Sequence, residues 1–207
     1  GLNKKNTKNW DYGLASFQTN LVNGKFLHEK GYTGKGVLVG VVDVGFSNVD
    51  VLNDFDSLIS NNRVVATYDF VENEIDVYDD PSHGTSVLST ISSFLDSTIV
   101  GTAPHANCLL LVSEDESQEN LIEEFNYIEA IEFADSCGVD IINTSLGYTD
   151  FDTKVFSHSR DELTGDSTWI TKATNIASRK GMLMVISAGN EGGSTWSNLT
   201  FPADADS

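Results

Sequence analysis

The sequence predicts an α/β fold in which a mostly parallel sheet carries helices on both faces. Short apolar runs alternate along the chain with segments whose apolar residues recur at helical spacing. The run at 37–42, VLVGVV, is apolar throughout, as is typical of a strand buried on both faces. Strand and helix in alternation favour right-handed βαβ units and therefore a parallel sheet.

The first half of the chain supplies the early elements of this alternation. Residues 14–30 have roughly helical spacing, interrupted at Asn23-Gly24, and the turn cluster GYTGKG follows. Strands are expected at 37–42, ending at Asp43, and at 63–70. A helix is expected over 83–95, with one apolar face made by Val87, Leu88, Ile91 and Leu95.

The second half continues the pattern. The expected elements, in order, are a strand at 108–112, a helix at 121–137, a strand at 139–145, a helix at 167–180 and a strand at 182–187. The helix at 121–137 stops at Gly138 because glycine suits the position after a helix end. Its wide apolar face is predicted to comprise Leu121, Ile122, Phe125, Ile128, Ile131 and Phe133. Residues 148–166 are polar and predicted to be irregular.

Composition narrows the class of protein. A length of 207 residues with 40% hydrophobic residues fits one folded domain. The formal net charge of −19 argues against nucleic acid as a partner, because such surfaces are basic, and against binding to an anionic membrane. No run of about 18 apolar residues predicts a membrane span, and the first residues, GLNKKNTKNW, lack the apolar run of a signal peptide.

Polar groups follow three of the expected strands. Asp43 ends the first strand, Ser145-Leu146-Gly147 ends another, and Ala188-Gly189-Asn190 follows the last. In open parallel sheets, ligands and chemistry lie at the carboxyl ends of the strands. These groups are therefore expected on one rim of the sheet, with His83 at the start of a helix.

Motifs in a fixed order carry a family resemblance. They are VVDVGF, HGTSVLSTI, GTAPHANCLLLV, INTSLG and VISAGNEG, and together they resemble the subtilisin-like serine proteases (subtilases, peptidase family S8) from about residue 31 to residue 207. The resemblance implies a three-layer subtilisin-like fold and a serine endopeptidase. The family's serine motif, of the Gly-Thr-Ser-Met-Ala type, does not occur after Asn190. Residues 1–207 are therefore expected to form an incomplete peptidase domain, its N-terminal two thirds, with the serine beyond residue 207.

The resemblance also implies roles for single residues. A serine hydroxyl needs an adjacent base, here His83, oriented by Asp43. Asn190 would donate to the oxyanion of the substrate carbonyl. The substrate-binding residues would be Ser145, Leu146, Gly147, Ala188 and Gly189, with both glycines leaving room for an extended peptide backbone. Val44 stands where the family usually has Ser or Thr, which removes one hydroxyl near the Asp43 carboxylate.

Other interpretations stay open beside this one. Asp43 and His83, taken singly, fit a strand-end carboxylate and a helix-start histidine with structural hydrogen bonds. A pseudoprotease of the same fold would keep these residues for binding without catalysis. A nucleotide-binding domain is disfavoured, since Gly34-x-Gly36 precedes a strand where a dinucleotide fingerprint must follow one.

No cofactor is identified, and no metal ligand is assigned. Calcium is possible in the acidic loop that holds Asp150, Asp152, Asp161, Glu162 and Asp166, although a solvated loop is favoured. A Cys108–Cys137 disulfide is geometrically plausible and left open, and His28, His105 and His158 are predicted to be surface or capping residues. The expected partners are a polypeptide substrate and the remaining C-terminal part of the protease domain, and the expected location is secreted, cell-surface or periplasmic.

Overall fold

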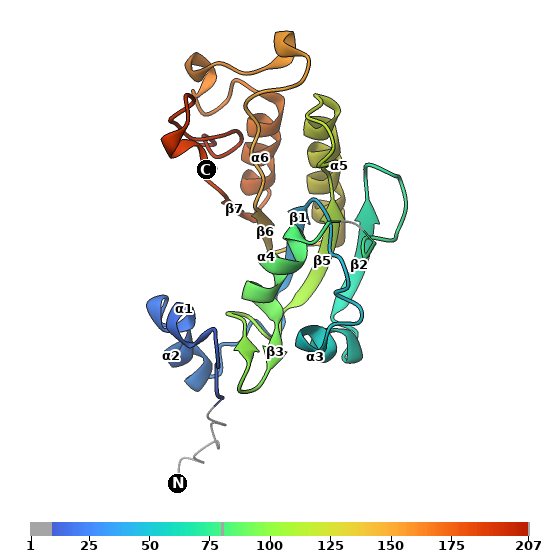
Figure 1. Cartoon of the computed structure of the whole chain (residues 1–207), viewed down its shortest axis with the longest axis vertical. Coiled ribbons are helices and arrows are strands. Elements are labelled where there is room, and N and C mark those ends of the chain that lie inside the picture. The colour runs from blue at the N-terminus through green and yellow to red at the C-terminus, as the bar shows by residue number, and fades with distance from the viewer. Residues whose placement is uncertain (1–9, 80, 207) are drawn as a thin grey trace.

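The computed structural model describes residues 10–79 and 81–206, and its centre is a five-stranded sheet (Figure 1). All neighbouring strands of this sheet pair in parallel, in the order β2-β5-β1-β6-β7. The strands are β1 (Leu38–Asp43), β2 (Val64–Asp69), β5 (Asn107–Val112), β6 (Ile141–Thr144) and β7 (Leu183–Ile186). The predicted parallel sheet is confirmed.

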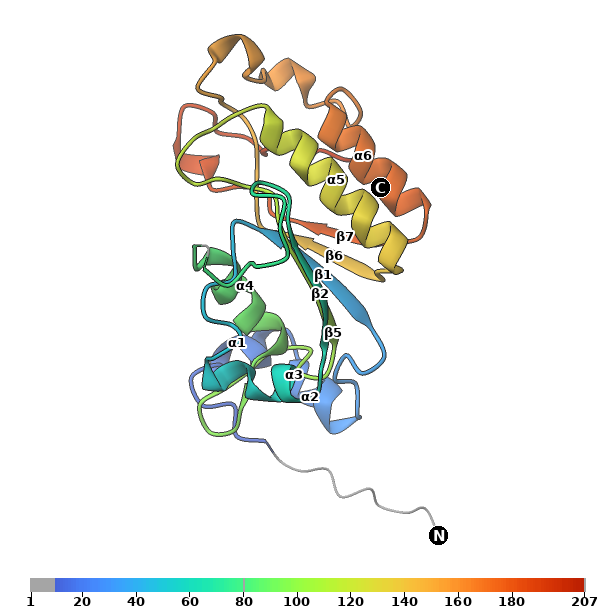
Figure 2. The same cartoon turned by 90° about the vertical axis from the view of Figure 1, so that its right-hand side faces the viewer.

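Helices lie on both faces of the sheet, giving the three layers that the sequence predicts (Figure 2). Two long helices, α5 (Ile122–Cys137) and α6 (Trp169–Arg179), cover one face. The other face carries α4 (His83–Ser92) and the short α3 (Asp56–Ser60). The central strands are buried on both sides because successive side chains point to opposite layers: Leu109 and Leu111 pack under α5, whereas Leu110 packs toward α4.

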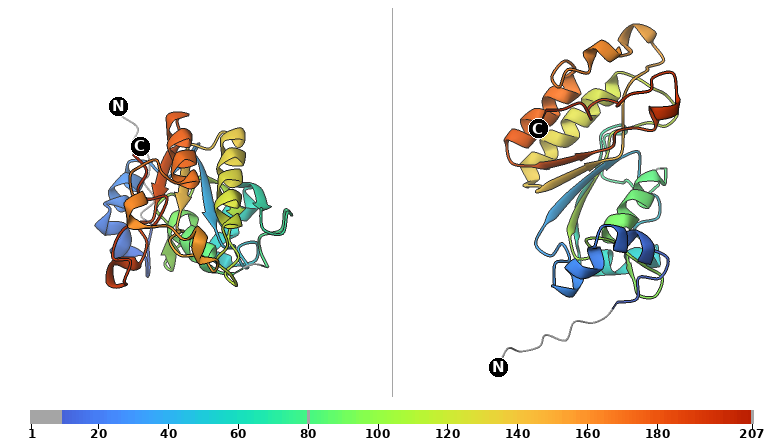
Figure 3. Two further views of the ribbon diagram at one scale, coloured as in Figure 1. Left: turned by 90° about the horizontal axis from the view of Figure 1, so that it is seen from above. Right: turned by 90° about the vertical axis from the view of Figure 1, so that its left-hand side faces the viewer.

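Smaller elements complete the molecule at the end of the sheet opposite the candidate site. Figure 3 shows the N-terminal helices on the same side of the sheet as α4. These elements are α1 (Ser16–Leu21), α2 (Gly24–Glu29) and the antiparallel pair β3 (Phe94–Leu95) and β4 (Ile99–Val100).

Short 3-10 turns occur in the connections between the larger elements. They are η1 (Asn53–Phe55), η2 (Lys154–Phe156), η3 (Arg160–Glu162) and η4 (Glu191–Gly193).

The structure corrects the end of one predicted helix and part of the apolar face of another. The helix expected over 83–95 ends at Ser92, because Ser93 turns into an extended conformation and Leu95 belongs to β3. The predicted apolar face of α5 enters the core only in part: Ile131 is 3% exposed, whereas Ile122 and Phe125 are 59% and 44% exposed. Glu123 and Glu124, on the same helix, are buried. The predicted glycine stop is confirmed at Gly138, which adopts the left-handed conformation with φ 75°.

The structure decides the disulfide question that the sequence leaves open, and two of the histidines differ from expectation. Both cysteines are free, because Cys108 packs in the layer on the α4 side, while Cys137 is exposed at the end of α5 on the opposite face. His28 is 8% exposed, with one ring nitrogen 2.8 Å from the Tyr12 hydroxyl. The His158 side chain is 10% exposed. Within the described ranges, no helix has the length and apolar composition needed to cross a membrane, and residues 1–9, inspected above for a signal peptide, lie outside those ranges.

Candidate active site

A buried carboxylate and a histidine meet at the carboxyl end of β1. Asp43 is the last residue of β1 and is fully buried, and His83 is the first residue of α4. The Nδ1 atom of His83 lies 2.7 Å from Oδ1 of Asp43, and the histidine side chain is 51% exposed. The two residues are 40 positions apart in the sequence, and the fold brings them into a direct hydrogen bond at the predicted rim.

The start of α4 is held against the end of β1 by its first residues. Gly84 is buried, and a Cβ atom there would overlap the carbonyl oxygen of Gly45 and lie 3.0 Å from Cβ of Asp43. The Thr85 hydroxyl donates a 2.9 Å hydrogen bond to the carbonyl oxygen of Ser47. The Gly-Thr pair of the HGT motif therefore sets the closeness of helix and strand on which the Asp43–His83 bond depends.

The two oxygens of the Asp43 carboxylate have different surroundings. Oδ1 accepts from His83 and, at 2.9 Å, from the backbone N–H of Val44. Oδ2 has no hydrogen-bond partner in the described part of the chain. Burial raises the pKa of Asp43, and the hydrogen bond to His83 and the Val44 N–H oppose that rise. Val44 has no side-chain hydroxyl that could donate to Oδ2, so only one of the two carboxylate oxygens accepts hydrogen bonds.

The first predicted substrate segment follows β6. Ser145 is half-buried, and its hydroxyl accepts a 3.1 Å hydrogen bond from the side-chain amide of Asn143. Leu146 is 9% exposed and packs in the core on the α5 side. Gly147 is exposed. The Leu146 side chain therefore belongs to the core, and only the main chain of this residue is available to a peptide.

The second predicted substrate segment follows β7, at the same carboxyl end of the sheet as the first. β6 and β7 pair in parallel, with Thr144 opposite Ile186. Ala188 and Asn190 are exposed, and Gly189 is half-buried. Asn190 precedes the short turn η4, and its own φ and ψ are −103° and 8°. The structure thus brings Asn190 to the rim that holds Asp43.

The space beside Gly147 and Gly189 is already filled by this chain. A Cβ atom at Gly147 would overlap Oγ1 of Thr200, and one at Gly189 would lie 2.6 Å from Cγ2 of Thr200. The expectation that both glycines leave room for a substrate backbone is therefore incomplete, because they first leave room for Thr200. Sequence reasoning missed Thr200, since its only signal is the Thr-Phe-Pro stretch far along the chain.

Ser86 follows His83 by three residues and lies in the same HGTS stretch. It is exposed, and its hydroxyl donates a 3.3 Å hydrogen bond to the carbonyl oxygen of Ser82 at the start of α4. The hydroxyl therefore bonds within its own helix start.

An acidic pocket of about 440 Å³ lies beside Val44 and the end of β5. Its carboxylates are Asp69, Glu72, Glu114, Asp115 and Glu116. Burial raises the pKa of Glu114 to about 8, although the hydroxyl of Tyr148 donates a hydrogen bond to this carboxylate and opposes the rise. Across residues 10–79 and 81–206, no three His, Cys, Asp or Glu side chains form a group that could hold a metal ion.

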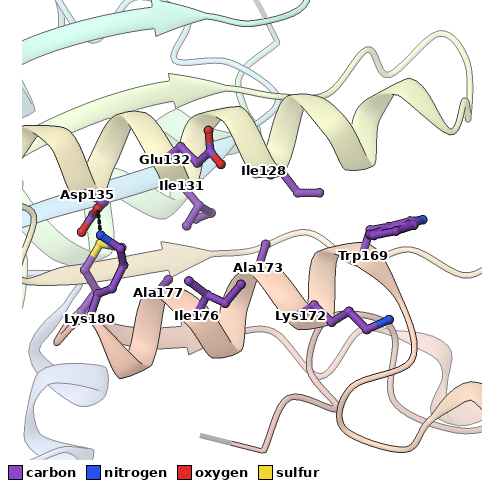
Figure 4. Close-up of a pocket in the computed structure, with 11 residues that line it drawn as sticks. Ile128, Ile131, Glu132, Asp135, Trp169, Lys172, Ala173, Ile176, Ala177 and Lys180 are labelled. Carbon is purple, nitrogen blue, oxygen red and sulfur yellow. Dashed lines mark hydrogen bonds and ion pairs between the residues drawn. The ribbon is translucent and has the colours of Figure 1, made fainter.

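A second hollow lies away from the rim, between α5 and α6 (Figure 4). This groove of about 350 Å³ is mainly apolar, with Ile131 and Trp169 among its lining residues. An ion pair of 2.5 Å between Lys180 and Asp135 bridges the two helices there. None of the predicted site residues lines the groove.

The fold and the rim define an α/β protein in which a buried carboxylate holds a histidine at the carboxyl end of a parallel sheet. The chain belongs to the Subtilase family, whose sequence profile matches residues 34–207. The match begins before β1 and includes Asp43, His83 and Asn190.

Individual relatives agree with this assignment. Subtilisin E of Bacillus subtilis (strain 168) is 32% identical over 196 residues, which cover 93% of this chain and 43% of that protein. Subtilisin of Bacillus pumilus is also 32% identical, covering 93% of this chain and 60% of that protein. The crystal structure of MycP1 with the N-terminal propeptide removed has the same fold, with a TM-score of 0.61, 24% identity, and coverage of 83% of this chain and 48% of that one. The chain thus spans less than two thirds of the length of these relatives.

Proposed function

We propose that this chain is the N-terminal part of a serine endopeptidase domain. The observation that carries the proposal is the 2.7 Å contact between the buried Asp43 carboxylate and Nδ1 of His83 at the carboxyl rim of the sheet. In this proposal, Asp43 orients His83, His83 is the general acid and base, and Asn190 binds the oxyanion. The nucleophilic serine comes from the part of the domain that follows residue 207.

The proton path follows from this contact. An ionised carboxylate only accepts hydrogen bonds, so the proton between the two side chains is on Nδ1 of His83. Nε2 then carries a lone pair, and the half-exposed ring can receive a serine on that side. Nε2 takes the serine proton as the hydroxyl attacks the substrate carbonyl, and it later returns this proton to the leaving amine. The Asp43 charge stabilises the imidazolium between these steps.

Asn190 and the two rim segments would position the substrate. The side-chain amide of Asn190 would donate to the carbonyl oxygen as its negative charge develops, a contribution of about 10²–10³ in turnover in enzymes of this kind. The main chain of residues 145–147 would pair with an extended peptide. The proposed substrate is therefore a polypeptide.

The exposed edge of the sheet supports a further C-terminal part as the structural partner. β7 is an edge strand, and the side chains of Leu183 and Val185 are 59% and 48% exposed. Apolar side chains on a sheet edge favour burial by another element. One relative is the Minor extracellular protease Vpr of Bacillus subtilis (strain 168), and we propose a secreted, cell-surface or periplasmic location for this chain as well.

A fluorophosphonate probe tests the proposed function on the complete protein. Reaction at a single serine beyond residue 207 is expected, with intact mass giving one adduct. His83→Ala should reduce labelling by at least about 10³ while the circular dichroism spectrum stays unchanged. A pseudoprotease would show no adduct with either protein, and a folded His83→Ala variant labelled at the normal rate would refute the role of His83.

A further inference from the structure

A third hollow, lined mainly by aromatic side chains, lies where the edge strand β2 meets α5. Its volume is about 350 Å³. The side chains that line this aromatic hollow are those of Tyr68, Phe70, Asn73, Glu129 and Phe133. None of them lines the groove between α5 and α6 or the acidic pocket at the end of β5. The aromatic hollow is therefore a separate feature of the surface.

The regular spacing of strand and helix brings its aromatic side chains together. Tyr68 and Phe70 are two residues apart at the end of β2, so both point to the α5 face of the sheet. Glu129 and Phe133 are four residues apart, so they lie on one face of α5. Because β2 is an edge strand, no further strand pairs with its outer side among the described residues (Figure 1).

The three rings are half-buried and are held at angles to one another. The ring centroids of Tyr68 and Phe70 are 4.8 Å apart with planes at 58°, and those of Phe70 and Phe133 are 6.2 Å apart with planes at 70°. The Tyr68 hydroxyl donates a 2.5 Å hydrogen bond to Oδ1 of Asn73, which fixes this ring. Tilted rings present more than one π face to the same space, and such faces attract cations.

The Glu129 side chain brings a negative charge to the same space. It is exposed, and it takes part in no ion pair or side-chain hydrogen bond within residues 10–79 and 81–206. None of the five lining residues is Lys, Arg or His. The formal net charge of the chain is −19, so the field of the whole molecule also favours a positively charged partner.

We propose that the aromatic hollow binds the guanidinium group of an arginine side chain on a partner polypeptide. A guanidinium group is planar, so it can stack on one of the rings while its N–H groups donate to the Glu129 carboxylate. It is more weakly hydrated than the ammonium group of lysine and therefore loses less on entering a half-buried site. A quaternary ammonium group would gain the aromatic contact but has no N–H to donate to Glu129.

The test measures binding to the complete protein carrying His83→Ala, so that no peptide is cleaved. The ligands are acetyl-Gly-Arg-Gly-amide and the same peptide with citrulline, which keeps the shape of arginine and lacks its charge. The arginine peptide should change the amide chemical shifts of β2 and α5. Its affinity should exceed that of the citrulline peptide by at least about fivefold, because only the charged group gains both contacts.

Two variants separate the aromatic and the ionic contact. Phe133→Leu removes one ring and should lower the affinity for the arginine peptide by about twofold to thirtyfold. Glu129→Gln removes the charge at an exposed position and should lower this affinity by about twofold to fivefold. The matched controls are Glu132→Gln, on the same helix but outside the aromatic hollow, and Glu116→Gln, in the acidic pocket. Both controls should leave the affinity unchanged.

The inference is overturned by equal affinities for the arginine and citrulline peptides, or by no binding of the arginine peptide at millimolar concentration. It is also overturned by an unchanged affinity in Glu129→Gln, a result that stays decisive if Phe133→Leu does not fold. Loss of binding in Glu116→Gln would assign the arginine to the acidic pocket instead. Tighter binding of tetramethylammonium than of ethylguanidinium would exclude guanidinium as the preferred group. No measurement involves turnover, so the proposed function is not at stake in these outcomes.

Discussion

The Asp43–His83 contact depends on a neighbouring residue that has no side chain. Gly84 is the second residue of α4, and the space where its Cβ would stand is occupied by the backbone of Gly45. A backbone carbonyl cannot rotate away as a flexible side chain can. The distance between the helix start and the strand end is therefore fixed by the absence of one methyl group.

Gly84→Ala is expected to separate the Asp43–His83 pair. The new methyl group would force α4 away from β1, and overpacking of this kind costs about 1–3 kcal/mol. Fluorophosphonate labelling of the complete protein should fall by at least about tenfold, and urea unfolding should show the lower stability. Ser86→Ala, on an exposed position of the same helix, is the control and should change neither quantity; loss of labelling in this control would instead make Ser86 a candidate nucleophile.

Val44→Thr tests the half-satisfied carboxylate. The substitution keeps the branched shape and adds a hydroxyl next to Asp43, whose Oδ2 has no partner among the described residues. A hydrogen bond to a charged group contributes about 1.5–3 kcal/mol, and loss of an apolar methyl offsets part of it, so a gain of about 1 kcal/mol in the free energy of unfolding at pH 7 is expected.

The sign of the pH dependence follows from the Asp43 pKa. Burial raises this pKa, so Asp43 keeps its proton to a higher pH in the folded state than in the unfolded state. The free energy of unfolding therefore falls as pH rises from the unfolded-state pKa to the folded-state pKa. A donor to Oδ2 reverses part of this loss, and the gain from Val44→Thr should disappear near pH 3, where Asp43 is protonated in both states. Val44→Ala, which adds no donor, should only destabilise. A gain that persists unchanged at pH 3 would exclude the carboxylate as its source.

At the scale of elements, one buried pair ties the irregular segment after β6 to the start of α5. The Nε2 atom of His158 lies 2.5 Å from Oε1 of Glu124, and these side chains are 10% and 1% exposed. The backbone N–H of His158 also donates to the carbonyl oxygen of Thr149 at 2.8 Å. The loop is therefore anchored at its middle, near the Phe201 segment that holds Thr200.

His158→Ala should loosen this loop. The change leaves Glu124 buried without its hydrogen-bond partner, and a buried polar group left unsatisfied costs about 1–3 kcal/mol. Urea unfolding should show the loss, and limited proteolysis should cut between residues 149 and 166 before any other site. Asp161→Asn, on an exposed position of the same loop, should leave both results unchanged, and equal proteolysis of wild type and His158→Ala would show that the pair is not the anchor.

The elements differ in how far the sequence predicts them. β1 and β5 follow from apolar runs that only a strand buried on both faces explains, and the end of α5 follows from Gly138. The short α3 and the β3–β4 pair have too few residues for a period to emerge, and their position depends on packing against α4 and η1. Glu123 and Glu124 look like a solvated face in the sequence, yet both are buried. Glu124 contacts His158 of the loop after β6, and Glu123 accepts hydrogen bonds from the backbone N–H groups of Asp115 and Asn120.

The same limit applies to the candidate site. The rim positions of Asp43 and Asn190 follow from the parallel sheet, because the carboxyl ends of its strands meet at one edge. The position of Thr200 beside Gly147 and Gly189 does not follow in this way, since it depends on a contact between residues 147 and 200 that no local pattern encodes. Long-range contacts of this kind decide which side chains fill the rim, whereas the order of strands decides where the rim lies.

At the scale of the whole molecule, acidic charge is the dominant feature. The formal net charge is −19, and several carboxylates gather around the pocket at the end of β5. Burial raises the pKa of Glu114 to about 8 and that of Glu123 to about 7. Self-repulsion and the burial of these groups act in the same direction, so the folded chain should lose stability as pH rises from about 5 to about 8.

Glu114→Gln measures how much of this loss comes from one buried carboxyl group. Its pKa is about 8 in the folded chain and near the ordinary value of 4.5 in the unfolded one, so the wild type loses the contribution of Glu114 as pH rises through this window. Glutamine cannot ionise and still accepts the hydrogen bond from Tyr148. The variant should therefore have a Tm about 5 °C higher than wild type at pH 8.5 and an equal Tm near pH 4. Glu116→Gln removes the same formal charge from an exposed position and should give less than half of that gain; equal gains for both variants would mean that net charge alone, and not the buried carboxyl group, sets the pH dependence.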